Sequence, residues 1–440
     1  MSNKAGQMSK DKKQQTLVPK LRFPEFRDAP EWPEIALKGL LSSISNGLSL
    51  TQSSTPPGVP VTRIETISGG SIDMNNVGYI ESNDDLSSYR IRAGEILFSN
   101  INSIAHIGRS VLASQDLDLY HGMNLLRLRV DSDSNDPRFV FYYLNTPSVR
   151  DSIRRRANKA VNQASINQTE LGRTRLAAPK IAEQRKISDC LSSLDDLIAA
   201  AERKLEGLQK HKQGLMQQLF PRKGETQPRL RFPEFQDAGG WQDKELGPMT
   251  RKVGSGITPK GGSRNYKDEG RPFIRSQNVG WGHLILDDVV HIDEETHASF
   301  DGSEIELDDV LLNISGASIG RCGVADERIV GGNVNQHVCI IRTDRDSLVP
   351  VILSYFLTSE SGQRQIDQCQ AGGNRQGLNF GQIRSFTIPV PPLVAEQQRI
   401  GDCLSALDVQ IAAQAKKLDA LRTHKCGLMQ KLFPAPEDQQ

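Results

Sequence analysis

The chain has 440 residues and a formal net charge of +1 at pH 7, from 54 Lys and Arg against 53 Asp and Glu. This length allows two or three domains with their own cores, and near-neutrality excludes a polycation that binds nucleic acid through overall charge. The six cysteines show no C-x-x-C spacing, which favours free thiols in a reducing cytoplasm.

Residues 1–31 are predicted to be a polar tail that ends in the lead-in LRFPEF at 21–26. The tail lacks the apolar stretch of a signal peptide, and no apolar run in the chain approaches the ~18 residues of a membrane span. We therefore expect no membrane association. The composition of LRFPEF leaves its role open, and packing against a helix end is the simplest expectation.

Residues 32–181 are predicted to form a first module of mixed α+β structure. Alternating runs at 95–99 and 125–130 are typical of strands, and 139–150 is typical of an amphipathic helix.

A long helix is predicted at 182–221. Its apolar residues alternate steps of four and three over about five heptads, which indicates a coiled-coil seam with Lys212 as a polar break. Glu183 puts negative charge at the helix N-terminus, where the helix dipole favours it.

The same organisation then recurs. A linker at 222–240 carries a second LRFPEF at 230–235, and a second module is predicted at 241–394, with a strand at 337–342 and a helix at 351–362. A second helix at 395–434, broken by Gln414 and Lys425, precedes a tail at 435–440. The segments 182–221 and 395–434 align without a gap and are identical at 25 of 40 positions.

This duplication is the strongest signal in the sequence. Each seam is too long for its own module to cover, so we expect the two helices to bury each other in a pseudo-two-fold, antiparallel arrangement with one module at each end. An amphipathic helix lying on its own module is the alternative.

The two modules share a skeleton but differ in their loops. The segments that align are 58–67 with 270–279, 94–109 with 308–321, 139–153 with 351–366, and 166–179 with 378–392, whereas the segments between them diverge. Divergent loops on a shared scaffold are typical of ligand selection. Two different specificities in one chain indicate an asymmetric target with two parts.

The ordered set of features resembles the DNA-specificity subunit of type I restriction-modification systems. The resemblance rests on two variable modules, each followed by a helix that opens with P-x-x-x-E-Q and closes with GLMQ-x-LFP, and on the lead-ins and the shared I-G-R turns. It implies a non-catalytic subunit that binds double-stranded DNA and joins two modification subunits, which methylate adenine N6 with S-adenosylmethionine. It also implies restriction subunits that use ATP and Mg for translocation and cleavage, and no cofactor in this chain.

Candidate DNA contacts follow from residue type, since Arg suits guanine, Asn and Gln suit adenine, and basic clusters suit phosphates. In the first module they are Arg63, Asn100, Asn102, Arg109, Arg154, Arg155, Arg156, Lys159, Asn162 and Gln163. In the second they are Lys260, Arg264, Tyr266, Arg275, Asn313, Arg321, Asn374, Arg375 and Gln376.

Positions shared by the modules suit phosphates or the scaffold, whereas positions that differ suit bases. Lys260, Tyr266, Arg375 and Gln376 are therefore better base readers than Arg275. Arg109 and Arg321 follow shared glycines, and holding the fold is the alternative for both.

Motifs for catalysis are absent from the sequence. It contains no G-x-x-x-x-G-K-[ST] phosphate loop and no Asn- or Asp-Pro-Pro-aromatic motif, and the spacing of His283, His291 and His297 fits no compact metal site. Two alternatives stay open: a coiled-coil adaptor that binds other proteins, and a stand-alone DNA enzyme with an unrecognised site.

Overall fold

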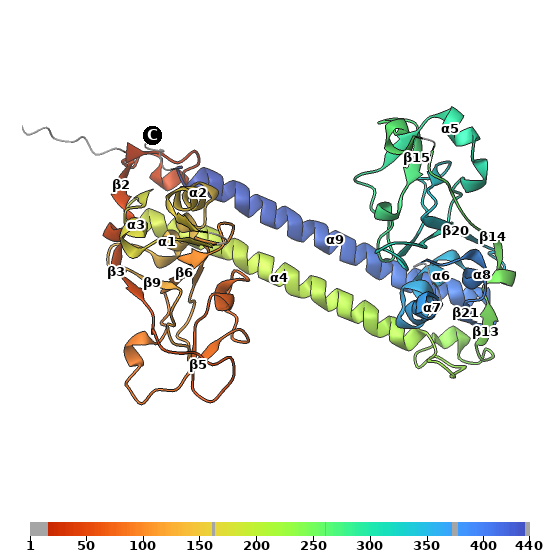
Figure 1. Ribbon diagram of the computed structural model, residues 1–440, viewed down its shortest axis with the longest axis horizontal. Helices are drawn as coiled ribbons and strands as arrows, with labels where there is room; N and C mark the ends of the chain where they lie inside the picture. Colours follow the sequence, from red (N-terminus) through yellow and green to blue (C-terminus); the bar gives the residue numbers. More distant parts are fainter. Residues whose placement is uncertain (1–15, 161–162, 260, 372–376, 436–440) are drawn as a thin grey trace, which may run out of the picture. The chain divides into compact units, whose positions relative to one another are not determined.

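The computed structural model describes residues 16–160, 163–259, 261–371 and 377–435. The chain divides into two compact units, Met1–Glu202 with Lys416–Gln440, and Arg203–Ala415. The two long helices, α4 (Ile181–Leu219) and α9 (Val394–Leu432), both cross this division. Each unit therefore combines one module with part of each long helix (Figure 1).

Unit 1 has a mixed module built around a sheet of order β3-β9-β6-β8, beside smaller sheets of order β1-β2-β12, β10-β11-β7 and β4-β5. Its strands are β1 (Thr16–Leu17), β2 (Trp32–Ala36), β3 (Leu41–Asn46), β4 (Val59–Val61), β5 (Gly78–Ile80), β6 (Ile96–Phe98), β7 (Ile101–Asn102), β8 (Ser110–Leu112), β9 (Leu126–Val130), β10 (Asn158–Ala160), β11 (Gln163–Ser165) and β12 (Arg175–Ala177).

The short helices of unit 1 are α1 (Pro137–Leu144), α2 (Pro147–Arg156) and α3 (Gln168–Gly172). The sequence predicts one helix at 139–150, which the structure divides in two. Pro147 is the reason, because the residue before a proline is disfavoured in the α conformation and Thr146 takes an extended one. The strands predicted at 95–99 and 125–130 are confirmed as β6 and β9.

Unit 2 repeats this plan with a sheet of order β14-β20-β17-β18. Its strands are β13 (Gln242–Glu245), β14 (Thr250–Ser255), β15 (Arg271–Ile274), β16 (Val290–Ile292), β17 (Val310–Asn313), β18 (Cys322–Val324), β19 (Asn333–Val334), β20 (Val338–Thr343) and β21 (Thr387–Val390). Its short helices are α5 (Glu294–Ala298), α6 (Pro350–Thr358), α7 (Glu360–Ala371) and α8 (Phe380–Arg384). The predicted α+β class is confirmed.

The two long helices pack against each other antiparallel within each unit. In unit 1, Asp195 on α4 pairs with Lys425 on α9, and Glu202, further along α4, pairs with Arg422, earlier on α9. In unit 2, Lys212 on α4 pairs with Asp408 on α9 at 2.6 Å. The predicted seam between α4 and α9 is confirmed, since the apolar positions Leu194, Ala201 and Leu418 are buried although they belong to neither module core.

The lysines that interrupt the seam belong to one polar cluster that occurs twice. In each unit a buried tyrosine hydroxyl donates to an aspartate at 2.7–2.8 Å, and the lysine ammonium lies over the tyrosine ring while it pairs with the same aspartate. Burial raises the pKa of both tyrosines, so both hydroxyls stay neutral donors. The clusters are Tyr142, Asp195 and Lys425 in unit 1, and Tyr355, Asp408 and Lys212 in unit 2.

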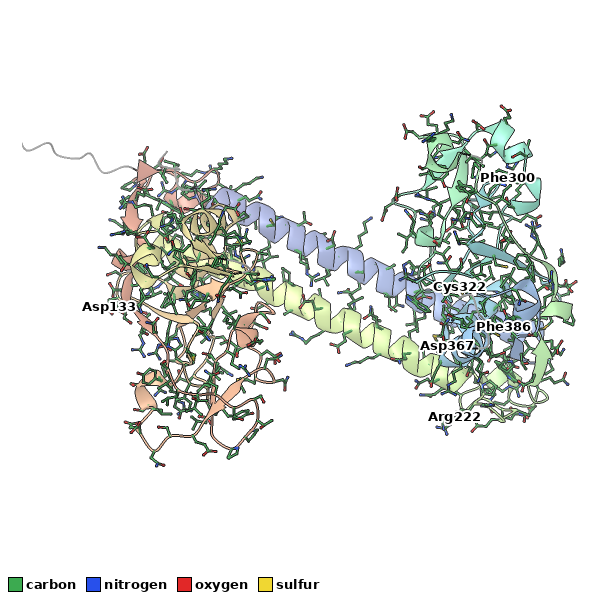
Figure 2. The ribbon with its side chains drawn as sticks, viewed as in Figure 1. Asp133, Arg222, Phe300, Cys322, Asp367 and Phe386 are labelled. Carbon is green, nitrogen blue, oxygen red and sulfur yellow. The ribbon has the colours of Figure 1, made fainter. Side chains whose placement is uncertain are left out.

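The C-terminal end of each long helix completes a module core. Leu432 and Phe433 of α9 and its following turn are buried in the first module's core, where Phe433 packs against Tyr143 at 4.8 Å. Leu219 at the end of α4 belongs to the second module's core, together with Phe386 (Figure 2). The repeated GLMQ-x-LFP ends therefore contribute residues to the module cores.

Each LRFPEF lead-in binds to ends of the long helices, as expected. Arg22 donates two hydrogen bonds of 2.7 Å to the carboxylate of Glu183, and Arg231 repeats this with Glu396 at 2.8 and 2.7 Å. The backbone amide of Leu21 donates to the carbonyl of Lys431 near the end of α9 at 2.9 Å. Each lead-in thus joins the start of one long helix to the end of the other.

Candidate nucleic-acid interface

One edge of the main sheet in each module gathers the divergent loops. The sheet β3-β9-β6-β8 is antiparallel throughout, so β3 and β6 end at the same edge at which β9 and β8 begin. The segments 47–53, 99–109 and 120–125 meet there. In unit 2 the same topology brings 256–259, 314–321 and 335–337 together. We call these two groups the sheet-end loops of module 1 and module 2.

Backbone hydrogen bonds show that the sheet-end loops are equivalent. The amide of Ser99 donates to the carbonyl of Arg109 at 2.8 Å, and Asn313 donates to Arg321 at the same distance. The return bonds, from Gly108 to Ser99 and from Gly320 to Asn313, are both 2.9 Å. The loop frame is therefore shared while its side chains differ.

A hairpin with exposed polar residues extends the sheet-end loops of module 1. Strands β10 and β11 pair with each other and β11 pairs with β7, which brings Ala164 opposite Asn102. Lys159 and Gln163 are exposed on this hairpin, as is Arg155 at the end of α2. Asn162 lies outside the described residues. A cation and an amide on an exposed hairpin can reach a phosphate and a base edge.

The asparagines and the arginine of the 99–109 loop are tied to the protein. Asn100 donates to the carbonyl of Ile166 at 3.5 Å, and Asn102 donates to the hydroxyl of Ser99 at 3.1 Å. Arg109 donates to the carbonyl of Ser68, and it lines a hollow of about 120 Å³ with Asn102 and His106. The bond to Ser68 favours the fold-holding alternative for Arg109.

The arginine cluster of α2 divides by role. Arg156 is half-buried and donates to the carbonyl of Glu170 and to the hydroxyl of Thr174, which fixes α2 against the chain around α3. Arg154 pairs with Asp151 at 2.9 Å and donates to the carbonyl of Ala105. Of the three, Arg155 is the exposed one, so it is the best placed for a phosphate.

Arg63 and its counterpart Arg275 differ in availability. The side chain of Arg63 is 41% exposed, lies 3.8 Å from Glu65 and lines a hollow of about 270 Å³. Arg275 is 19% exposed, donates to the carbonyl of Asp288 at 2.9 Å, and stacks over Tyr266. Arg63 can therefore reach a ligand more easily than Arg275.

The remaining candidates of module 2 lie around that stack. Arg264 is exposed on the turn before Tyr266, whose ring also packs on Phe273 at 5.6 Å. Asn313 is fully buried and donates to the carbonyl of Ser276, so it cannot reach a base without rearrangement of β17. Arg321 is half-buried. Lys260, Asn374, Arg375 and Gln376 lie outside the described residues.

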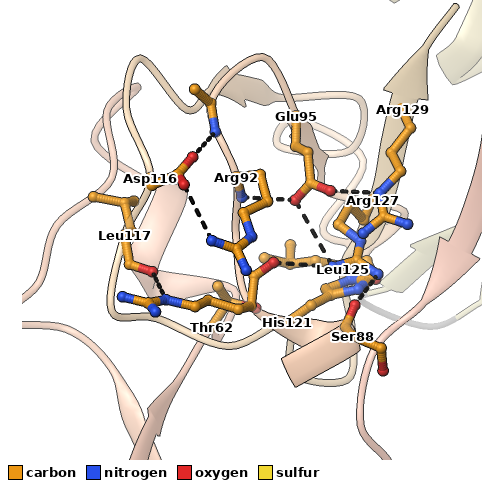
Figure 3. Close-up of polar contacts among 12 residues, drawn as sticks. Thr62, Ser88, Arg92, Glu95, Asp116, Leu117, His121, Leu125, Arg127 and Arg129 are labelled. Carbon is orange, nitrogen blue, oxygen red and sulfur yellow. Dashed lines mark hydrogen bonds and ion pairs between the residues drawn. The ribbon is translucent and has the colours of Figure 1, made fainter. Parts of the chain in front are cut away.

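A partly buried ionic network lies behind these loops in module 1 (Figure 3). Glu95 pairs with Arg129 at 2.5 Å and lies 3.8 Å from Arg127, whose pKa burial lowers. Nearby, His121 is fully buried, and burial lowers its pKa to about 4. Its Nε2 donates to the carbonyl of Leu125 at 3.0 Å. Because burial lowers the pKa so far, this histidine is neutral at pH 7.

Sequence reasoning missed the loop before β9 and its counterpart before β20. Met123 and Asn124 are exposed in the first, and Gln336 and His337 are exposed in the second. Part of the signal was present, since Met123, Asn124 and Gln336 precede the strands predicted at 125–130 and 337–342, whereas His337 was placed inside the second of these strands. What the sequence could not show is the sheet edge that these residues share with the other loops.

The exposed side chains of the sheet-end loops are mainly polar, so they can donate or accept hydrogen bonds. Within the ranges that the structure describes, no group of three or more His, Cys, Asp or Glu side chains is placed to hold a metal ion. Among the same residues, no helix is long and apolar enough to cross a membrane.

Comparison with known proteins adds independent evidence. Residues 30–210 and 239–423 both match the model of the type I restriction modification DNA specificity domain. The chain is 30% identical over 415 residues to a putative type I restriction enzyme MjaX specificity subunit from Methanocaldococcus jannaschii, covering 93% of this chain and 94% of that protein.

Solved structures agree on the fold. The S subunit of the type I restriction-modification system from M. genitalium matches with a TM-score of 0.65 at 17% identity, over 95% of this chain and 99% of that one. A chain from a structure on complex assembly and conformational transition of the type I R-M system matches with a TM-score of 0.51 at 17% identity, over 92% and 97%. With two matched domains, a full-length relative and the shared fold, this chain belongs to the family of type I restriction-modification DNA specificity subunits.

Proposed function

We propose that the chain reads an asymmetric DNA target in two parts, one part with the sheet-end loops of each module. The observation that carries the proposal is the pair of equivalent loop frames with different exposed side chains, on a repeated scaffold in a family of DNA specificity domains. Equivalent frames suit the same kind of ligand, and different side chains suit different sequences.

The near-neutral net charge limits how the chain can bind DNA. With 54 basic against 53 acidic residues, phosphate contacts must come from local cations such as Arg155 and Lys159, or from partner subunits. We propose two modification subunits and the restriction subunits as these partners, with the whole assembly in the cytoplasm.

We further propose that this chain is not an enzyme. S-adenosylmethionine would bind in the modification subunits, and ATP and Mg would bind in the restriction subunits. This assignment is supported by the sequence, which has no phosphate loop or methyltransferase motif. The contribution of this chain to the reaction is to position its partners on DNA.

The test is selection of randomised duplex DNA by the chain assembled with its modification subunits. The proposal predicts a consensus of two specified half-sites separated by an unspecified gap. Assembly without any sequence preference would refute it and turn attention to the coiled-coil adaptor. Methyl transfer or nicking by the isolated chain would refute the non-catalytic assignment.

A further inference from the structure

The loops before β9 and β20 occupy the same place in the two modules. Tyr120 pairs with Val61 and Leu126 pairs with Asn46 in module 1. Asn333 pairs with Phe273 and Cys339 pairs with Ser255 in module 2. Tyr120 and Leu126 are six residues apart, as are Asn333 and Cys339. Met123 therefore corresponds to Gln336, and Asn124 corresponds to His337.

The backbone around these positions is held by close packing. A Cβ atom on Gly47 would lie 2.1 Å from the carbonyl oxygen of Gly122, and one on Gly256 would lie 1.6 Å from that of Val334. Both distances are far below a van der Waals contact, so only glycine allows the two chain segments to touch. The side chains that follow Gly122 and Val334 are therefore presented from a fixed backbone.

In module 1 these side chains border a hollow with unused polar groups. Met123 is 38% exposed and, with Asn124 and Arg63, lines the hollow of about 270 Å³. The amide nitrogen of Gln52 on its wall is buried and has no hydrogen-bond partner among the described residues. The side chain of Arg63 is 41% exposed, so it can donate to an acceptor that enters this hollow.

Asn124 has the left-handed backbone conformation, with φ of 71°. Glycine takes this conformation without strain, whereas asparagine is among the few other residues that tolerate it. The chain therefore retains an exposed amide at a position where glycine would be easier to accommodate. Strained exposed residues cluster at ligand sites, which supports a binding role for this amide.

In module 2 the equivalent residues form a hydrogen-bonded chain between three loops. The hydroxyl of Thr258 donates to the amide oxygen of Gln336, and the amide nitrogen of Gln336 donates to Nε2 of His337 at 3.0 Å. Nδ1 of His337 shares a hydrogen bond with the hydroxyl of Ser315. Gln336 and His337 are exposed, so the chain holds two polar side chains in place at the surface.

We propose that Met123 and Asn124 in module 1, and Gln336 and His337 in module 2, determine specificity by contacting base edges in the DNA major groove. This inference rests on the proposed function. An amide suits adenine and an apolar side chain suits the thymine methyl group, so the half-site read by module 1 contains an A·T pair at the position of Asn124. The half-site read by module 2 differs because an amide and an imidazole occupy the same two places.

The experiment exchanges these pairs in the full chain, assembled with its modification subunits. The variant M123Q/N124H should change or relax one or two positions of one half-site, with an about 10- to 100-fold lower preference for the original base there. Q336M/H337N should do the same to the other half-site only. Gln236→His, at an exposed amide just after the second LRFPEF, should leave both half-sites unchanged.

A further variant distinguishes the loss of a base contact from misfolding of the chain. Asn124→Gly relieves the left-handed backbone and removes the amide, so the chain should fold and lose selectivity at one position. The inference would be overturned if the wild-type assembly selects a two-part consensus and M123Q/N124H, Q336M/H337N and Asn124→Gly all select the same one. The proposed function would then stay intact. Absence of any consensus with the wild-type assembly would instead overturn the proposed function.

Discussion

Substitution of Arg22 tests whether the lead-in LRFPEF stabilises the start of α4. The side chains of Arg22 and Glu183 are 9% and 4% exposed, and Arg22 also donates to the carbonyls of Ala29 and Pro30. Arg22→Gln leaves a buried carboxylate without its cation, which costs about 3–5 kcal/mol. We therefore expect local opening in unit 1 to increase by roughly 100-fold or more.

The matched control joins the same two segments. Lys186 pairs with Glu25 at 2.9 Å, but the two side chains are 48% and 45% exposed. Solvent and salt screen an exposed pair, so Lys186→Gln should change opening by less than roughly tenfold. The comparison shows whether burial of the ion pair, rather than any ion pair between the lead-in and α4, stabilises this end of the helix.

Hydrogen exchange of the full chain, followed by mass spectrometry, measures this opening in peptides that cover 21–30 and 181–190. Unit 2 provides a repetition, with Arg231→Gln against Arg399→Gln, because the pair of Arg231 is 6% and 1% exposed and that of Arg399 is 51% and 48% exposed. Equal effects of the buried-pair and exposed-pair variants in both units would refute the reasoning.

Three further predictions follow from the fold and the interface. His121 is fully buried, and its pKa is about 4 against an unperturbed 6.5. Between these pH values the unfolded chain binds a proton that the folded chain does not. Unit 1 therefore loses up to about 3 kcal/mol of folding stability as the pH falls from 6.5 to 4. His121→Val, which installs the residue at the equivalent Val334, should remove this part of the pH dependence in urea unfolding at pH 7, 5.5 and 4.5. Arg155→Ala with Lys159→Ala should weaken DNA binding by the assembled complex by a similar factor for all sequences and lower the slope of affinity against salt. Deletion of one heptad from both α4 and α9 should shorten the helices by ~10 Å and the unspecified gap of the target by about 3 base pairs, as mapped by DNA selection.

One result would contradict each of these three predictions. An unchanged pH dependence in His121→Val would show that another group is responsible. A changed base preference in the Arg155 and Lys159 variant would assign these residues to base reading. An unchanged gap in a folded, active heptad-deletion variant would exclude the helices as the spacer.

The sequence predicts the helices well because the information is local. A heptad repeat and a 25-of-40 duplication determine which faces of α4 and α9 are buried, and the structure buries Leu194 and Leu418 as expected. The chain divides into its two compact units at points inside α4 and α9, and no local sequence pattern predicts these points. The division depends on Leu219 being a core residue of the module that follows α4, and on Phe433 being a core residue of module 1, which is distant in sequence.

The candidate interface was only partly predictable. Loops such as 99–109 were identified by the alignment of the two modules, but their meeting at one sheet edge depends on strand register, which is a non-local property. Asn313 illustrates the error that follows, because a polar residue in an aligned loop turned out to be a buried strand residue bound to Ser276. Met123 and Gln336 were missed because their exposure follows from the same register.

The most direct test of the central claim is mapping of N6-methyladenine in host DNA with and without this chain, while the modification subunits are present. The account predicts a methylated motif of two half-sites separated by a gap, and the loss of that motif when the chain is removed. Methylation of the same motif without the chain would contradict the account, as would an absence of any such motif with active partner subunits.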